Sequence, residues 1–223
     1  MIQSMKMIKA KITVRLTIFS LIVGILMSCS NPYEEIITKD DDGNPVSSYT
    51  VRKEDGVKEG LYQLFINGKL SEEGKYKDGK QDDVRTLFYE SGKKQVEEMY
   101  NDGNLVSKKT YFEDGKLQSE GQYDEAITMT GEWTYYYQNG KLKETVHFKN
   151  NVEDGVFTEY YENGNKKAEG TYIPVSFGVE IEGLEDGELK EYDEKGQLVT
   201  KKQCELGRCK TVWTTKEGDT SEN

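Results

Sequence analysis

Histidine and cysteine are scarce in this chain of 223 residues, which contains one histidine and three cysteines. His147 stands between Val146 and Phe148, and no serine–histidine–aspartate or cysteine–histidine arrangement can be assembled around it. Phosphate-binding glycine loops and dinucleotide-binding motifs are missing as well, because the glycines follow turn-forming residues. We therefore expect no catalytic residues, no cofactor and no metal site, and we do not expect an enzyme.

Basic residues are in deficit, with 30 Lys and Arg against 41 Asp and Glu and a formal net charge of −11. Residues 1–28 hold four basic and no acidic residues, so a chain without them carries −15. Nucleic acids and anionic lipid headgroups are bound by basic patches. We expect no nucleic-acid partner and no membrane contact through the folded part, whose charges also keep an open sheet soluble.

The chain does contain a recurring glycine. From Gly43 onward, the steps between successive turn glycines are 25, 24, 23, 25, 24 and 32 residues. Asn-Gly and Asp-Gly steps between apolar runs predict two-residue type I′ turns, in which both central residues have φ > 0. A fixed period of this length indicates a repeat array. The predicted turn glycines are Gly68, Gly92, Gly115, Gly140, Gly164 and Gly196.

Bulky residues recur at fixed distances from these glycines, four and three positions before and eight positions after them. Further turns at Asp55-Gly56, Asp78-Gly79 and Asp102-Gly103 divide each repeat into two strands. A single hairpin is marginally stable in water, so neighbouring hairpins must pair and stack their rings. We predict an all-β fold, an elongated antiparallel sheet of repeated β-hairpins. The predicted repeat core is Phe88, Tyr111, Trp133, Tyr136, Phe157 and Tyr160.

The best-formed repeat reads Gly-Glu-Trp-Thr-Tyr-Tyr-Tyr-Gln-Asn-Gly-Lys-Leu-Lys-Glu from Gly131 to Glu144. This pattern resembles the MORN repeat, and is most similar to the variant in bacterial proteins of the YwqK type, which are often labelled antitoxins. The resemblance covers residues 43–213 and implies a twisted sheet of hairpins that acts as a scaffold or interaction surface. The sequence departs from the pattern at residues 173–186, which lengthen one repeat.

Residues 1–28 are predicted to be a helical lipoprotein signal peptide. A basic segment precedes the apolar run Leu16–Met27, which is too short for a membrane-spanning helix. The run ends in Leu26-Met27-Ser28-Cys29, which resembles a bacterial lipobox. Cys29 is therefore the predicted lipidation site, and the alternative is an ordinary secretory signal with a chance cysteine.

The predicted anchor gives an expected location and domain organisation. Ser30 rather than an aspartate follows Cys29, which by analogy with lipoprotein sorting favours the outer membrane. Residues 29–42 are predicted to form an acidic tether, residues 43–213 the repeat domain, and residues 214–223 a polar tail. The expected location is the cell envelope, with the N-terminal lipid as the only membrane contact.

The other two cysteines, Cys204 and Cys209, flank a predicted turn at Gly207. A hairpin can bring such a pair within bonding distance, and the envelope is oxidising. We predict a disulfide that pins the last hairpin. A reactive pair or a metal site is the alternative, but nearby histidine or further cysteine ligands are missing.

Two features could carry recognition. The rings at Trp133, Tyr135, Tyr137, Phe157 and Tyr161 could line a concave groove or simply pack across strands. Residues 173–181 could be a working loop or an extra strand pair. We expect a non-catalytic scaffold that binds an unknown protein or a cell-wall or glycan partner. The alternatives are a glycan-binding lipoprotein and an antitoxin or immunity protein, although a lipobox argues against neutralising a cytoplasmic toxin.

Overall fold

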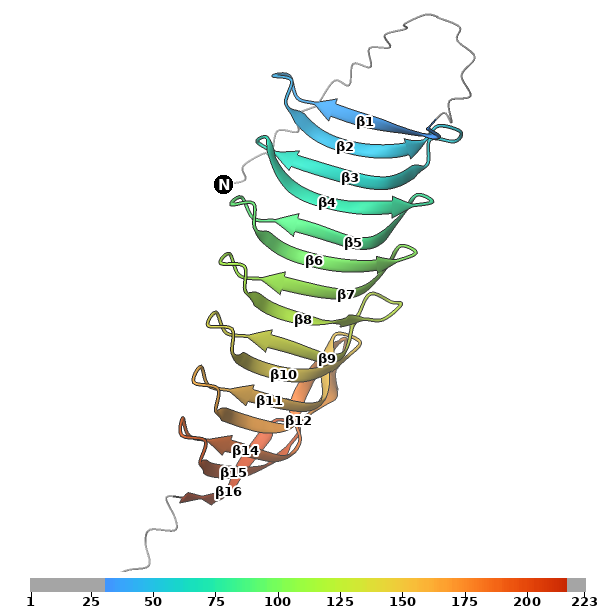
Figure 1. Ribbon diagram of the computed structural model, residues 1–223. Helices are drawn as coiled ribbons and strands as arrows, with labels where there is room; N and C mark the ends of the chain where they lie inside the picture. Colours follow the sequence, from blue (N-terminus) through green and yellow to red (C-terminus); the bar gives the residue numbers. More distant parts are fainter. Residues whose placement is uncertain (1–30, 216–223) are drawn as a thin grey trace, which may run out of the picture. The chain divides into compact units, whose positions relative to one another are not determined.

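The computed structural model describes residues 31–215, which form one antiparallel sheet (Figure 1). Its 16 strands are β1 Tyr33–Lys39, β2 Pro45–Arg52, β3 Lys58–Ile66, β4 Lys69–Lys77, β5 Lys80–Phe88, β6 Lys94–Asn101, β7 Asn104–Tyr111, β8 Leu117–Tyr123, β9 Met129–Tyr136, β10 Leu142–Lys149, β11 Val152–Tyr160, β12 Lys166–Phe177, β13 Glu180–Glu185, β14 Gly187–Tyr192, β15 Leu198–Glu205 and β16 Arg208–Thr214. Each strand pairs with its sequence neighbours, with one exception. β13 pairs with β12 only, and β14 pairs with β12 instead of with β13. The predicted fold class, a sheet of repeated hairpins, is confirmed.

Some of the predictions concern the two ends of the chain. The signal peptide over residues 1–28, Cys29, and residues 216–223 of the predicted tail lie outside the described residues. The predicted tether over residues 29–42 is corrected in part, because β1 pairs with β2 across Ile36 and Tyr49. An edge strand needs only one neighbour and tolerates charged side chains, so a polar composition did not exclude a strand here.

The six predicted turn glycines all lie at chain reversals with φ between 73° and 94°. At the first of these turns both Asn67 and Gly68 have positive φ, as a type I′ turn requires. At the turns of Gly140 and Gly164, the described backbone has a positive φ at the glycine but not at the preceding asparagine.

The later turns are therefore three-residue loops and not the predicted type I′ turns. Gly140 N donates to Tyr137 O, and Tyr137 N donates to Lys141 O, both at 2.8 Å. This pattern is a type I turn followed by a left-handed residue, which introduces a bulge into the hairpin. Besides Asn67-Gly68, pairs with the positive φ values of a type I′ turn lie at the opposite ends of the strands, as at Asp78-Gly79 and Asp102-Gly103.

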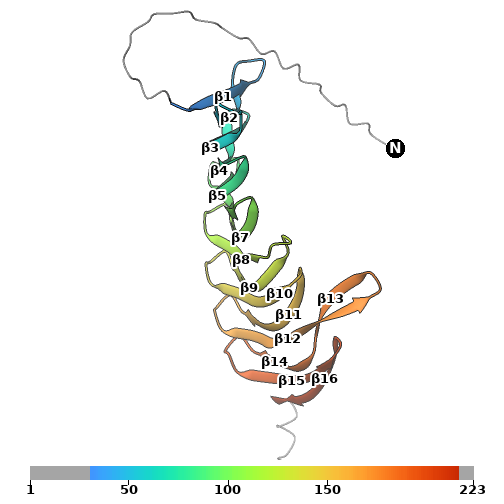
Figure 2. The same cartoon turned by 90° about the vertical axis from the view of Figure 1, so that its right-hand side faces the viewer.

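The sheet bends across its strands, so that one face is concave (Figure 2). Along this face runs a line of residue pairs that we call the central row. Each pair joins the residue seven positions before a turn glycine (six in the first repeat, with its shorter turn) to the residue six positions after it. The pairs are Tyr62 with Gly74, Arg85 with Glu98, Lys108 with Gly121, Trp133 with Val146, Phe157 with Gly170, and Leu189 with Lys202.

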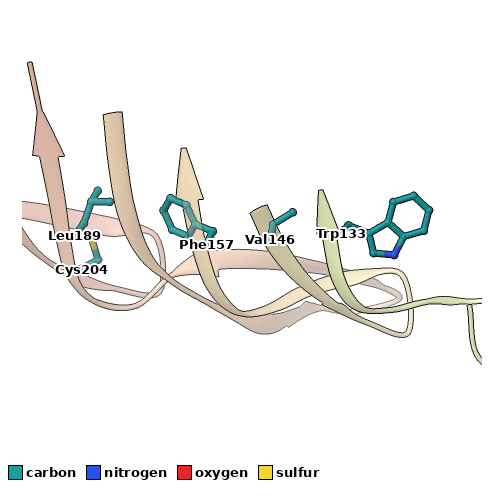
Figure 3. Close-up of a cluster of buried hydrophobic side chains, with 5 residues drawn as sticks. All are labelled: Trp133, Val146, Phe157, Leu189 and Cys204. Atoms are coloured by element: carbon teal, nitrogen blue, oxygen red, sulfur yellow. The ribbon is translucent and has the colours of Figure 1, made fainter. Parts of the chain in front are cut away.

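The second half of the central row is apolar except for Lys202 and forms the hydrophobic core. Trp133, Val146, Phe157 and Leu189 succeed one another inside the curve of the strands, and Cys204 completes the cluster (Figure 3). Rings from the row eight positions after the turn glycines pack on it. Phe157 stacks on Tyr172 with centroids 4.3 Å apart. Because the sheet is a single layer, side chains of one face must cover one another, and the curvature makes this possible.

The first half of the central row is charged. The Arg85 guanidinium donates to both oxygens of Glu72 at 2.8 Å and to Glu98 at 2.7 Å. Tyr62 and Tyr100 donate to the same two carboxylates. Burial raises the pKa of Glu72, but the bonds from Arg85 and Tyr62 outweigh it and leave that pKa below its ordinary value. A hydrogen-bonded network here replaces the apolar cluster.

The six residues predicted as the repeat core lie on both faces of the sheet. Trp133 and Phe157 are buried in the central row with 4% exposure each. Positions four and seven before the glycine differ by three residues, which places them on opposite faces of a strand. Phe88, Tyr111, Tyr136 and Tyr160 are accordingly half-buried on the convex face. There Tyr136 donates to Glu120 at 2.9 Å.

Substitution of Gly121 tests the close packing of the central row. A Cβ at position 121 would overlap the Trp133 ring. We expect Gly121→Ala to lower the free energy of unfolding by about 1–3 kcal/mol, the usual cost of overpacking, measured by urea denaturation. In a Trp133→Leu background the same substitution should cost much less, because the ring is gone. Equal costs in both backgrounds would show that the contact is not tight.

Candidate functional site

The turns at the glycine end of the hairpins are tied to one another. Three positions before the glycine, a tyrosine hydroxyl donates to a backbone carbonyl of the next repeat. Tyr137 reaches Tyr160 O at 2.6 Å, and Tyr161 reaches Tyr192 O at 2.8 Å. These bonds run along the sheet, from one hairpin to the next, and so join repeats that have no core of their own.

The Asn-Gly-Lys part of the motif makes further ties between the same turns. Lys141 Nζ donates to Asn163 O at 2.6 Å, and Asn139 Nδ2 donates to Glu162 O at 3.0 Å. Lys116 makes the equivalent bond to Gln138 O at 2.8 Å. The most recognisable residues of the repeat are therefore occupied by structural bonds, and recognition must use other positions.

The concave side of this rim has hollows between the ties. Phe112 takes the place of the tying tyrosine in its repeat and has no hydroxyl to donate. A hollow of about 290 Å³ lies beside it, and its lining includes no carboxylate. The lining residues include Phe112, Gln118, Tyr135, Tyr137, Gln138 and Lys143.

A second hollow, of about 380 Å³, lies on the concave face over β11, β12 and β14. Rings and carboxylates share its lining, which includes Phe157, Glu159, Tyr161, Tyr172, Glu185 and Glu191. Two of the carboxylates are paired, Glu159 with Lys167 at 2.7 Å and Glu191 with Lys202 at 2.6 Å. We call the concave face from β9 to β15 the acidic groove.

Among residues 31–215, Glu144 and Glu153 of the acidic groove have no cation within ion-pair distance, and neither has Glu185, which lines the second hollow. Burial raises the pKa of Glu144, and the negative charges of Glu159 and Glu153 raise it further. Burial and Glu185 likewise raise the pKa of Glu153. Unpaired, half-buried carboxylates beside aromatic rings create a site that favours a positively charged or hydrogen-bond-donating partner.

Of the rings predicted to line a groove, some are buried in the core and others line the hollows. Trp133 and Phe157 are buried, and their main role is packing. Tyr135 and Tyr161 line the two hollows. His147 is half-buried on the face opposite Phe157, with Nδ1 3.4 Å from Val156 O. The carboxylates of the acidic groove were not predicted as a site, because Glu is common throughout the sequence.

The structure joins Cys204 and Cys209 in a disulfide between β15 and β16. Within residues 31–215, no group of three or more His, Cys, Asp or Glu side chains is arranged to hold a metal ion. The same described part of the chain has no helix with the length and apolarity needed to cross a membrane.

Comparison with known families identifies the hairpins. The model of the MORN repeat variant matches residues 84–102, 103–125, 129–150, 153–173 and 185–203. The chain is a MORN-repeat protein. Each match spans one hairpin from its first strand through its glycine turn to its second strand, so the MORN repeat is the structural unit of this sheet.

Solved structures with similar segments include TarM, which is 20% identical over 54% of this chain and 21% of its own, with a TM-score of 0.26. Another is the GtfA/B complex bound to UDP and GlcNAc, which is 12% identical over 48% of this chain and 21% of its own, with a TM-score of 0.24. The MORN-repeat chain thus spans about a fifth of the length of these proteins. Among curated proteins, the comparison found no match.

Removal of one tie tests the link between MORN repeats. Tyr137→Phe deletes the hydroxyl that donates to Tyr160 O, and we expect a loss of about 1 kcal/mol in the free energy of unfolding. Tyr160→Phe is the matched control, because the Tyr160 hydroxyl has no hydrogen-bond partner among the described residues. Urea denaturation measures both variants, and equal losses would contradict a specific role for the tie.

The unpaired carboxylates should make stability depend on pH. Their pKa values are raised above 4.5 in the folded protein, so the folded state binds more protons, and stability falls as pH rises from about 4.5 through the raised values. Glu144→Gln with Glu153→Gln should therefore raise the melting temperature at pH 7 and leave it nearly unchanged at pH 4.

Glu132→Gln, an exposed position on β9, serves as the control and should change the melting temperature little at either pH. A decrease in melting temperature at pH 7 for the double variant would mean that a cation neutralises the two carboxylates in the folded protein.

Proposed function

We propose that this MORN-repeat protein is a lipid-anchored scaffold of the bacterial envelope that binds another protein and catalyses no reaction. Cys29 in the lipobox-like segment would carry the lipid, and residues 30–32 would link it to β1. The acidic groove would be the binding surface.

The observation that supports this proposal most strongly is the contrast between the glycine turns and the acidic groove. The recurring turn residues donate hydrogen bonds to neighbouring repeats, whereas the groove leaves Glu144 and Glu153 without cations within ion-pair distance in the described part of the chain. Leaving carboxylates unpaired in a half-buried place costs stability, so a partner that neutralises them would bind with a favourable electrostatic contribution.

A glycan partner is the second candidate, supported by the hollow beside Phe112. Its lining of tyrosine rings, two glutamine amides and one lysine, without a carboxylate, could stack on and hydrogen-bond to a sugar ring. Glycan-array binding that is lost on Gln118→Ala would favour this candidate. Trp133 is unsuitable for such a test, because it is buried. The immunity role suggested by YwqK-type relatives would require that deletion of this gene alone be toxic and that deletion of a neighbouring gene relieve it.

Crosslinking in intact cells followed by affinity capture tests the scaffold. The proposal predicts that the native chain captures a defined protein, and that Glu144→Lys with Glu153→Lys loses it while Glu132→Lys does not. The anchor has its own measurement, since Cys29→Ser should move the protein from the membrane to the soluble fraction. Capture that both lysine variants retain, or a Cys29→Ser protein that stays with the membrane, would overturn the corresponding half of the proposal.

A further inference from the structure

The hairpin of β12 and β13 departs from the repeat pattern. The step between Gly164 and Gly196 is 32 residues instead of 23 to 25. β12 continues beyond Tyr172, where its pairing with β11 ends, and β13 pairs with β12 alone. The hairpin projects from the sheet (Figure 2). Repeat stacking does not require this segment, because β14 resumes pairing with β12 at Ala168 and Glu169.

Apolar side chains are exposed at the end of this hairpin. Val179 is fully exposed, and Phe177 and Ile181 are 56% and 54% exposed. Leu206, in the turn between β15 and β16, is 51% exposed. Of these residues, Phe177 and Leu206 line the same hollow. Exposed apolar residues gathered at one place on a strongly charged protein indicate an interaction site.

A hollow of about 400 Å³ separates the hairpin from the β15–β16 turn. It is lined by Val175, Phe177, Glu205, Leu206 and Arg208. The two walls are fixed to each other, since Gly207 N donates to Glu185 O at 2.9 Å and Leu206 N donates to Asp186 Oδ1 at 3.3 Å. The hollow is therefore a preformed feature and can accept an apolar side chain.

Acidic side chains surround the apolar surface. Residues 173–189 contain five acidic and no basic residues. Phe177 pairs across the hairpin with Glu180, and Val175 with Glu182, so carboxylates and apolar groups alternate on the same face. Glu180, Glu182 and Glu205 make no ion pair within residues 31–215, and Arg208 is the only cation in the lining. This charge opposes contact with an anionic bilayer and complements a basic chain.

From this combination we propose that the hollow and the hairpin end bind a polypeptide segment in which aliphatic residues alternate with lysine or arginine. An aliphatic side chain enters the hollow against Phe177 and Leu206, and its basic neighbours lie against Glu180 and Glu182. The inference rests on the proposed scaffold role and adds a second contact beyond the acidic groove, with the chemistry of the partner segment that docks there.

A fluorescein-labelled lysine–valine alternating octapeptide tests the inference by fluorescence anisotropy with the full chain. We expect saturable binding that weakens as salt is added. Phe177→Ser, or Glu180→Lys with Glu182→Lys, should weaken it at least tenfold. Ile66→Ser and Glu34→Lys with Glu35→Lys are the matched controls, because they change an exposed apolar residue and an acidic pair at the other end of the sheet. They should bind as the native chain does.

Equal binding of a lysine–serine octapeptide would show that charge alone suffices, and would overturn the role of the hollow. Binding to neutral phosphatidylcholine vesicles, or self-association, that is lost with Phe177→Ser in the absence of peptide binding would assign the surface to a bilayer or a second copy and also overturn the inference. If the Phe177→Ser chain still captures its crosslinked protein from cells, the scaffold stands and the docking inference alone fails.

Discussion

The structure depends on the pairing of each strand with both neighbours in a sheet that has only one layer. No second sheet or helix covers either face within residues 31–215, so each hairpin is stabilised mainly by the hairpins beside it. Strand pairing supplies the continuous backbone bonds, the central row supplies buried contacts on the concave face, and the turn ties join adjacent repeats at the rim. This is the energetic pattern of repeat proteins, in which nearest-neighbour interfaces supply what a single repeat cannot.

The two halves of the central row meet the same requirement with different chemistry. In the first half, Arg85 bridges Glu72 and Glu98. In the second half, Trp133, Val146 and Phe157 form an apolar cluster, in which the Trp133 indole N–H donates to Gln122 O at 3.2 Å. Both the charged network and the apolar cluster occupy the central row, where the curvature of the sheet brings side chains together. The apolar half lies beneath the acidic groove, which gives that groove a rigid floor. The unpaired carboxylates of the groove and the projecting hairpin are features that the repeat itself does not require.

Much of the fold could be predicted from the sequence, because the spacing of the turn glycines and the aromatic rows is local information. The central row was not found, although its signal is present. Gly121 and Gly170 each stand six residues after a turn glycine. Gly121 lies against the Trp133 ring, and Gly170 lies against the Phe157 ring. The bulky residues of the row are mainly charged in the first half and mainly apolar in the second, so composition conceals the row. The choice between a type I′ turn and a three-residue loop also could not be made from the Asn-Gly pair, since both place glycine at positive φ. The site could be predicted only in part. Glu144 and Glu153 have no lysine or arginine within ion-pair distance among the described residues, and this depends on the folded arrangement of the strands.

The most direct test of a continuous sheet held by neighbouring repeats is amide hydrogen exchange of the native chain, resolved strand by strand. The account predicts slow exchange without interruption from β3 to β15, with the slowest amides in β9 to β12 around Trp133 and Phe157, and faster exchange in the projecting β12–β13 end. A band of rapid exchange between two adjacent repeats, such as between β8 and β9, would divide the sheet into independent units and contradict the account.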